Sequence, residues 1–361
     1  MPTMKVNVFT NNSCGSSKGF NRPLLVMRDI FRTRGVELMF YYRRTRRLFN
    51  ADYLFINSNV FRPWWSLRRN EIFDFLHFGR KKGIKIFWFD TTDSTWCSQF
   101  PVLPYVDLFL KNQVFSDRKR YLKHYRTGRI FTDYFDELYD SGEPEKKYEL
   151  PDETGLSKLR ISWNACFENY TEKRYGLKAH LGQKLRELLS LSEDFNIIFT
   201  DPKKERKQTI SCRVGTSHIR PSVVAHRQAI MAEMDKRGIV FSKIPLSKYF
   251  TELQNSQIGI SPFGMGEITY RDYETIGCGC TLVKPDMGHL ETWPELFQSE
   301  KTYIAHHWDL SDLNEVVNKL LKEPERAIEI ANAAQDIYKK ALNKKGQETF
   351  VERIIKYMEM A

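Results

Sequence analysis

The sequence lacks any apolar run long enough to cross a membrane. A membrane-spanning helix needs about 18 to 20 consecutive apolar residues, and no stretch of the 361 residues approaches that length. Before the chain turns polar, its N-terminus has only a short apolar run, residues 6–9. That run is too brief for the core of a secretory signal. We therefore expect a cytoplasmic protein without a transmembrane segment.

Paired cysteines are also missing. The six cysteines are scattered, with no CxxC pair and no Cys/His cluster at the spacing of a zinc site. His306 and His307 adjoin Trp308, but neighbouring residues need not point the same way, so they do not indicate a metal site. We expect free thiols in a reducing compartment, no bound metal and no cofactor.

Positive charge is plentiful but uneven. The net charge is +11, and residues 1–150 hold 26 Lys and Arg against 16 Asp and Glu, so the excess lies almost wholly in this half. Within it, residues 42–47 (YRRTRR) and 61–69 (FRPWWSLRR) interleave arginine with aromatic side chains. This pattern suits single-stranded nucleic acid, a membrane headgroup layer, sugar stacking or a merely solvated face. Composition leaves all four open.

Short apolar runs alternate with helical patterns along the chain. Strands are predicted at residues 5–9, 53–56, 84–89 and 106–110, with a loop and then a helix at 23–33 after the first. Such alternation predicts parallel sheets with helices on their faces. The acidic stretch 136–157, broken by Gly and Pro, has the composition of an interdomain linker. We place the first domain at residues 1–150.

The second half repeats the alternation. Gly346 is expected to separate the last two helices, which gives a second domain at 151–345 and a terminal helix at 346–361. The predicted fold class is therefore α/β with two Rossmann-like domains and a cleft between them. The predicted strands lie at 159–163, 196–200, 239–241, 258–260 and 281–283, and the predicted helices at 178–191, 223–236, 247–254 and from 272.

The segment 261–285, SPFGMGEITYRDYETIGCGCTLVKP, has the features of an anion site. Gly264 and Gly266 are expected to turn the chain at positive φ before a short helix. A helix N-terminus at the carboxyl end of a strand favours a diphosphate. Arg271 adds a cation, and Glu274, three residues on and so on the same face, can accept bonds from ribose hydroxyls. An Arg and a Glu at this spacing are equally often a surface ion pair.

Residues 269–283, with Thr-x-Arg-x-x-Glu followed by Gly-Cys-x-Leu-Val, resemble the donor-site signature of exostosin-type and related GT-B glycosyltransferases. Residues 264–294 are similar to glycosyltransferase group 1 proteins. The resemblance implies an acceptor domain followed by a donor domain, a last helix that returns to the first domain, and a nucleoside diphosphate sugar as co-substrate without a metal requirement. It implies hexosyl or pentosyl transfer to a glycan hydroxyl. The donor-binding residues expected are Gly264, Gly266, Tyr270, Arg271 (phosphates), Glu274 (ribose), Lys173 and Arg174.

One departure concerns the glutamates. Retaining GT-B enzymes commonly show two glutamates separated by seven residues, whereas six residues separate Glu267 from Glu274. Glu267 stays a catalytic candidate, and the stereochemistry stays open. Lys173 and Arg174 follow the predicted strand 159–163, where they suit either the donor diphosphate or a solvated helix start.

The first domain offers further candidates. Gly15 and Ser16, in the loop after the first strand, either bring backbone amides to the donor phosphates or only form a turn. Asp90 and Asp93 end the strand 84–89 and face the expected cleft. A carboxylate there suits the general base of an inverting transferase, or equally a turn or helix cap.

Two function classes follow. The first is a glycosyltransferase that acts on a glycan or glycoconjugate and has a peripheral contact with an anionic membrane surface. The alternative is a non-catalytic nucleic-acid-binding α/β protein that uses the basic first half, although no RRM, KH or zinc pattern supports it.

Overall fold

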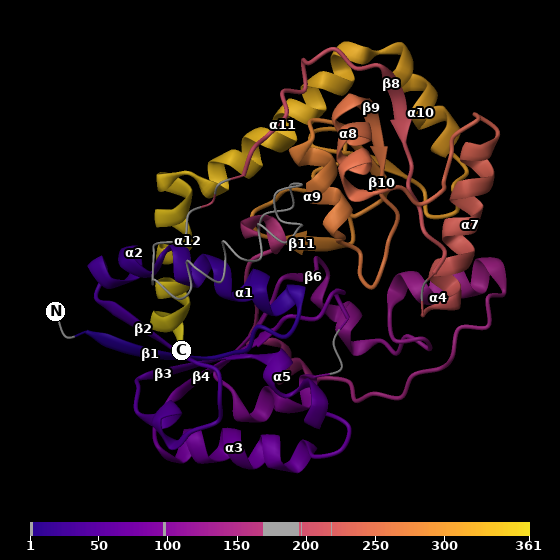
Figure 1. Cartoon of the computed structure of the whole chain (residues 1–361). Helices are drawn as coiled ribbons and strands as arrows, with labels where there is room; N and C mark the ends of the chain where they lie inside the picture. The colour runs from indigo at the N-terminus through magenta and orange to yellow at the C-terminus, as the bar shows by residue number, and fades with distance from the viewer. Residues whose placement is uncertain (1–2, 97–98, 169–194, 196, 218) are drawn as a thin grey trace.

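The computed structural model describes residues 3–96, 99–168, 195, 197–217 and 219–361. Two parallel sheets form the centres of two α/β halves, and helices cover their faces (Figure 1). The predicted helix 178–191 lies outside the described residues, as do Lys173 and Arg174.

The first sheet has six parallel strands in the order β2-β1-β3-β4-β5-β7. Its central strands are apolar and buried on both faces, as a sheet covered by helices requires. The four strands predicted for residues 1–150 are all present. Sequence reasoning missed the edge strand β2, in which Glu37 and Met39 are exposed. The elements are β1 (Met4–Phe9), β2 (Val36–Tyr41), β3 (Tyr53–Asn57), β4 (Lys85–Asp90), β5 (Leu108–Lys111), β7 (Leu159–Ile161), α1 (Gly15–Val26), α2 (Arg28–Thr33), α3 (Arg69–Lys81), α4 (Ile130–Tyr139) and α5 (Glu153–Leu156).

The strand predicted to open the second domain belongs to the first sheet. β7 pairs in parallel with β5, with Leu159 beside Phe109. The first sheet is therefore completed only at residue 161, beyond the boundary placed at 150. The acidic composition of residues 136–157 marks an irregular connection, but composition cannot say which sheet the next strand will join.

The second sheet has four parallel strands in the order β12-β10-β9-β8. The stretch predicted as a strand at 239–241 is irregular, and so are residues 197–200 of the strand predicted at 196–200. The strand β8, in contrast, forms at residues that were not predicted as a strand. β8 is short, and its pairing with β9 rather than its own composition decides its conformation. The elements are β8 (Gln208–Ser211), β9 (Ser256–Ile260), β10 (Thr281–Pro285), β12 (Ile304–His306), α7 (Pro221–Asp235), α8 (Leu246–Asn255), α9 (Tyr270–Gly277), α10 (Leu313–Lys322) and α11 (Pro324–Leu342).

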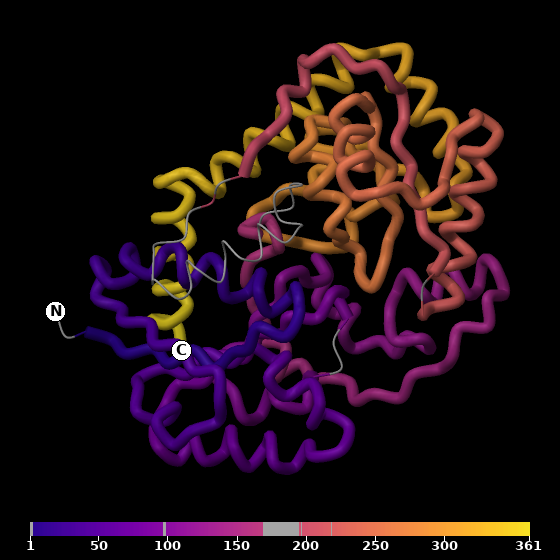
Figure 2. The backbone as a smooth tube through the Cα atoms, viewed as in Figure 1, coloured from indigo at the N-terminus to yellow at the C-terminus, as the bar shows by residue number. Residues whose placement is uncertain are grey.

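A strand pair and the last helix are among the elements that join the halves. β6 (Gln113–Phe115) and β11 (Leu290–Thr292) form an antiparallel pair with one strand from each half. The last helix, α12 (Lys344–Met360), lies beside the first strands of the chain (Figure 2). There the Tyr53 hydroxyl donates to the Met358 carbonyl over 2.9 Å. The chain thus ends against the domain in which it begins.

The break before α12 lies at Asn343. Its side chain accepts a hydrogen bond from the Gly346 amide over 2.9 Å and caps the helix. Gly346 is therefore inside the first turn of α12, and the prediction that it separates the two helices is wrong.

Gly266 lies at a close contact between the two halves. A Cβ atom at this position would overlap the backbone carbonyl of Asp93. Neither Gly264 nor Gly266 has a positive φ, so the predicted reason for these glycines is wrong. Glycine is required at position 266 because the contact with Asp93 leaves no room for a side chain. In this region Gly279, just after α9, has a positive φ of 71°.

We predict that Gly266→Ala lowers the free energy of unfolding by about 1 to 3 kcal/mol, because the new methyl group forces the two loops apart. Urea unfolding measures the change. Gly277→Ala is the matched control, since nothing lies within 4 Å of its added Cβ. Equal stabilities for the two variants would show that the loops separate without cost.

Candidate functional site

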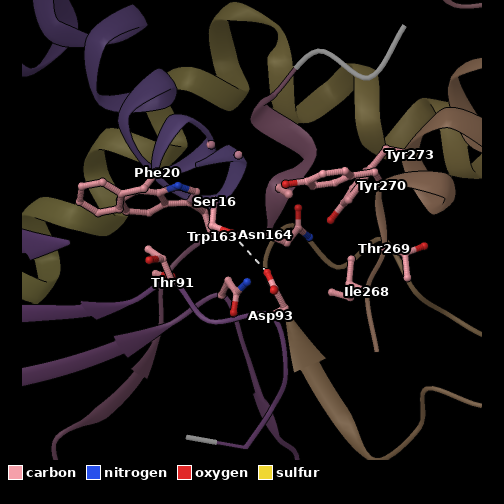
Figure 3. A pocket seen from close by; sticks show the side chains of 15 residues that line it. Ser16, Phe20, Thr91, Asp93, Trp163, Asn164, Ile268, Thr269, Tyr270 and Tyr273 are labelled. Atoms are coloured by element: carbon pink, nitrogen blue, oxygen red, sulfur yellow. Dashed lines mark hydrogen bonds between the residues drawn. The ribbon is translucent and has the colours of Figure 1, made fainter. Parts of the chain in front are cut away.

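A pocket lies between the two halves, at the carboxyl ends of the first-sheet strands. Its cavity volume is about 70 Å³. The first turn of α1, the loops after β4 and β7, and the first residues of α9 surround it (Figure 3). Ligands of open parallel sheets bind at this edge. The polar residues of its lining include Ser16, Thr91, Asp93, Asn112, Ser162, Asn164, Thr269 and Tyr270.

Gly15 and Ser16 begin α1 and do not lie in a loop. The side chain of the N-cap residue, Cys14, forms no capping hydrogen bond, so it does not satisfy the free amides of the first turn of α1. A Cβ atom on Gly15 would overlap the hydroxyl of Tyr270, which approaches from the second domain. Only glycine permits this approach, and the helix N-terminus favours an anion beside it.

Asp90 is not placed as a general base. Its carboxylate forms an ion pair with Lys111, and both side chains are fully buried. The amide of Thr92 donates to the same carboxylate over 2.9 Å. Asp90 also does not line the pocket. Its role in the structure is to neutralise a buried cation, which corrects the prediction of a cleft-facing base.

Asp93 does reach the pocket. The Ser16 hydroxyl donates to its carboxylate over 3.3 Å (Figure 3). Asp93 is an exposed residue, and the surrounding pocket wall partly desolvates its carboxyl group. This desolvation raises the pKa of Asp93 above the ordinary carboxyl value, although the charge of Arg129 and the bond from Ser16 oppose it. A carboxylate with a raised pKa at the pocket wall has the property needed for proton abstraction.

Glu267 is buried in the interface between the halves and does not line the pocket. It accepts hydrogen bonds from the Thr95 amide (3.1 Å) and the Gln113 side chain (3.2 Å), both from the first domain. Burial alone would raise its pKa, but His289, 3.6 Å away, and Thr95 outweigh burial and hold the pKa below its usual value. Its contacts are those of a structural bridge, not of a sugar-binding carboxylate.

Arg271 and Glu274 share one face of α9, as their spacing predicts, and both reach the same tyrosine. Tyr249 of α8 lies between them: its hydroxyl donates to Glu274 over 2.8 Å, and the Arg271 guanidinium lies 5.5 Å from its ring centroid. Thr269 and Asp272 form a capping box at the start of α9, and Lys284 binds Asp272 at 2.6 Å. The two functional candidates therefore project from a firmly anchored helix.

Arg227, on α7, joins this cluster although no local motif surrounds it in the sequence. Its guanidinium donates to the carbonyls of Phe263 (3.2 Å) and Gly215 (2.8 Å). Burial and then the like charge of Arg271 lower the pKa of Arg227 to about 10. Two cations are thus held near each other at the carboxyl edge of the second sheet. Only the fold brings residues so distant in sequence together.

The other candidates are placed as follows. Tyr270 is half exposed and lines the pocket. Gly264 lies in the loop before α9, where its amide donates to the Gly266 carbonyl over 2.9 Å. Lys173 and Arg174 are not described. Over the described ranges, no group of three His, Cys, Asp or Glu side chains is arranged to hold a metal ion. Over the same ranges, no helix has the length and apolar character required to cross a membrane.

Residues 239–345 match the family model described as "Glycosyl transferase-like". This match contains the segment 261–294, so the resemblance of that segment to glycosyltransferases is confirmed. The two parallel-stranded halves confirm the α/β fold class predicted from the sequence.

Among solved structures, the chain is similar to the Anabaena protein HepE in complex with UDP-glucose, at 8% identity over 99% of this chain and 100% of that one, with a TM-score of 0.45. It is also similar to a glycosyltransferase from Rickettsia africae, at 10% identity over 100% and 99% of the chains, with a TM-score of 0.46. A search of curated proteins finds no match.

We predict that Lys111→Met destabilises the protein by about 3 to 5 kcal/mol, because it leaves the Asp90 carboxylate buried without its cation. Urea unfolding measures the loss. The double variant Asp90→Asn with Lys111→Met should recover much of it. As a control, Arg34→Ala breaks the exposed pair with Glu352 and should cost less than about 1 kcal/mol. A Lys111→Met loss as small as the control would contradict a closed buried pair.

Proposed function

We propose that this chain, whose residues 239–345 match a glycosyltransferase family, transfers a sugar from a nucleoside diphosphate sugar to an acceptor hydroxyl. The donor is held by the second domain and the acceptor by the first. The observation that carries the proposal is the placement of Arg271 and Glu274 on either side of Tyr249, at the carboxyl edge of the second sheet, with Arg227 close enough to Arg271 for their charges to interact.

The diphosphate belongs beside the two arginines. Burial and, after it, the charge of Arg271 lower the pKa of Arg227, and the repulsion between the two arginines is relieved when an anion lies between them. Guanidinium groups bind phosphate oxygens in pairs of hydrogen bonds. The first turn of α1, which the Cys14 side chain does not cap, approaches from the opposite domain at Gly15, so its amides add positive potential on the other side.

The ribose belongs beside Glu274. The Tyr249 hydroxyl binds one oxygen of this carboxylate and so fixes its orientation. A carboxylate held in one orientation accepts hydrogen bonds from two vicinal hydroxyl groups without a further loss of side-chain entropy. Tyr249 is therefore a positioning residue for the donor.

Asp93 is the proposed base. It takes the proton of the acceptor hydroxyl while the acceptor oxygen forms a bond to the anomeric carbon. The bond from that carbon to the diphosphate breaks, and its electron pair leaves with the nucleoside diphosphate. Arg227, Arg271 and the helix amides stabilise the charge of the leaving group.

Nucleoside diphosphates should stabilise the folded protein. At 100 times the dissociation constant the gain is about 2.7 kcal/mol, which appears as a raised Tm in a thermal-shift screen across the common nucleotides. Glu274→Ala should remove this shift, whereas Glu325→Ala, an exposed glutamate in the first turn of α11, should keep it. If no nucleotide raises the Tm of the wild-type chain, the proposed function is wrong.

Asp93 should control the acid side of the pH profile. The base works only when deprotonated, so kcat/KM falls as the pH drops through its pKa, and the raised pKa moves this fall above that of an ordinary carboxyl group. Asp93→Asn should lower kcat/KM by about 10² to 10⁴ and remove the acidic limb. The nucleotide-induced Tm shift should persist in this variant. A full acidic limb in Asp93→Asn would assign the base elsewhere.

A further inference from the structure

A cationic and apolar surface on the first domain is not used by the proposed transfer. It consists of residues 42–47 and 61–69, the loops that follow β2 and β3, and we call it the arginine–tryptophan surface. The loops touch each other, because the Arg44 guanidinium lies 5.6 Å from the Trp64 ring centroid. Both leave the carboxyl edge of the first sheet, the edge that also carries the pocket.

The charge of this surface is largely uncompensated. Two of its seven arginines pair with carboxylates, Arg68 with Glu71 and Arg69 with Glu149. No salt bridge within the described ranges neutralises the others, and all of them are exposed. The surface therefore presents a compact group of positive charges to solvent. These five arginines are Arg43, Arg44, Arg46, Arg47 and Arg62.

Apolar side chains project among these charges. Leu67 is 84% exposed, the highest value among the large apolar residues described, and Tyr42 is 49% exposed. Leu67 lies three residues after Trp64, within the same loop. Basic, aromatic and aliphatic side chains on one face are the combination that binds the interfacial region of an anionic bilayer.

The aromatic geometry favours a lipid surface over nucleic acid. Stacking of bases needs open ring faces, but the Trp64 ring is flanked by Arg44 and by Arg68, whose guanidinium lies 4.7 Å from its centroid. Phe61 packs against the same ring at 5.9 Å. The exposed Leu67 offers nothing to a base and gains free energy only where it leaves water.

The surface leads directly to the pocket. Arg62 is close enough to Asp93 for its charge to lower the pKa of that carboxyl group. Asn59, between β3 and Arg62, donates to the hydroxyl of Thr91 over 2.7 Å, and Thr91 lines the pocket. A molecule anchored where Leu67 meets a bilayer would therefore lie beside the pocket mouth.

We propose that the arginine–tryptophan surface docks this protein on an anionic lipid bilayer, with headgroup phosphates on its arginines and Leu67 in the interfacial layer, and that the acceptor is a membrane-anchored saccharide. The docking stands alone, and the acceptor class rests on the proposed function. The surface then delivers the acceptor hydroxyl to Asp93 without its lipid leaving the bilayer.

Cosedimentation with vesicles tests the docking. Wild-type protein should sediment with vesicles of equal parts phosphatidylglycerol and phosphatidylcholine, be released at high salt, and stay in solution with phosphatidylcholine alone. Arg43→Gln with Arg46→Gln should weaken binding about 30-fold, and Leu67→Gln about tenfold. The matched control, Lys344→Gln with Lys345→Gln, removes two exposed charges at the start of α12 and should bind like the wild type.

Several results would overturn the docking. These are no sedimentation with either vesicle, equal sedimentation with both, or equal loss in the α12 control variant. Displacement by millimolar inorganic phosphate would indicate a phosphate site, and tighter binding of an oligothymidine that depends on Arg43 and Arg46 would indicate nucleic acid. Each variant must keep the wild-type Tm and nucleotide shift. If the wild-type protein binds vesicles but no nucleotide raises its Tm, the docking is supported and the proposed function is rejected. If a nucleotide raises its Tm but it does not bind vesicles, the proposed function is supported and the docking is rejected.

Discussion

The contact between the loop 264–267 and the first domain determines how the rest of the structure fits together. Glu267 enters the first domain and receives hydrogen bonds from Thr95 and Gln113, while Gly266 lies against the backbone of Asp93. A buried carboxylate is tolerated only when such donors replace water. Because this loop also leads into α9, the same contact that joins the domains sets where Arg271 and Glu274 stand relative to Asp93.

Buried charges elsewhere are neutralised in pairs, and this distinguishes structural from functional groups. Lys111 is paired with Asp90, and Lys284 with Asp272. Such pairs place a full charge in the interior only where an opposite charge accompanies it. Asp93 differs, since desolvation raises its pKa by more than Arg129 and Ser16 lower it. Arg227 differs too, because its charged neighbour is another arginine. Ionisable groups whose pKa is perturbed and that lie at a pocket or sheet edge are candidates for binding a ligand.

The distribution of charge over the surface supports the same division of labour. The first domain carries the excess of arginine at its carboxyl edge, beside the pocket, and apolar Leu67 lies among these charges. The second domain places Arg227 and Arg271 at the predicted donor cluster. A donor in solution and an acceptor at a charged surface would thus approach the cleft from different sides, which suits a reaction between a soluble nucleotide and an anchored saccharide.

The sequence alone determined the α/β class, most first-sheet strands, and the shared helix face of Arg271 and Glu274, because periodicity and helical spacing are local properties. It could not distinguish Asp90 from Asp93, three residues apart, since only the fold brings Lys111 to the first and leaves the second at the pocket. It could not assign β7 to the first sheet or find Arg227 and Tyr249. Strand partners, burial and charge neighbours depend on residues far away in the chain, so only the tertiary structure decided them.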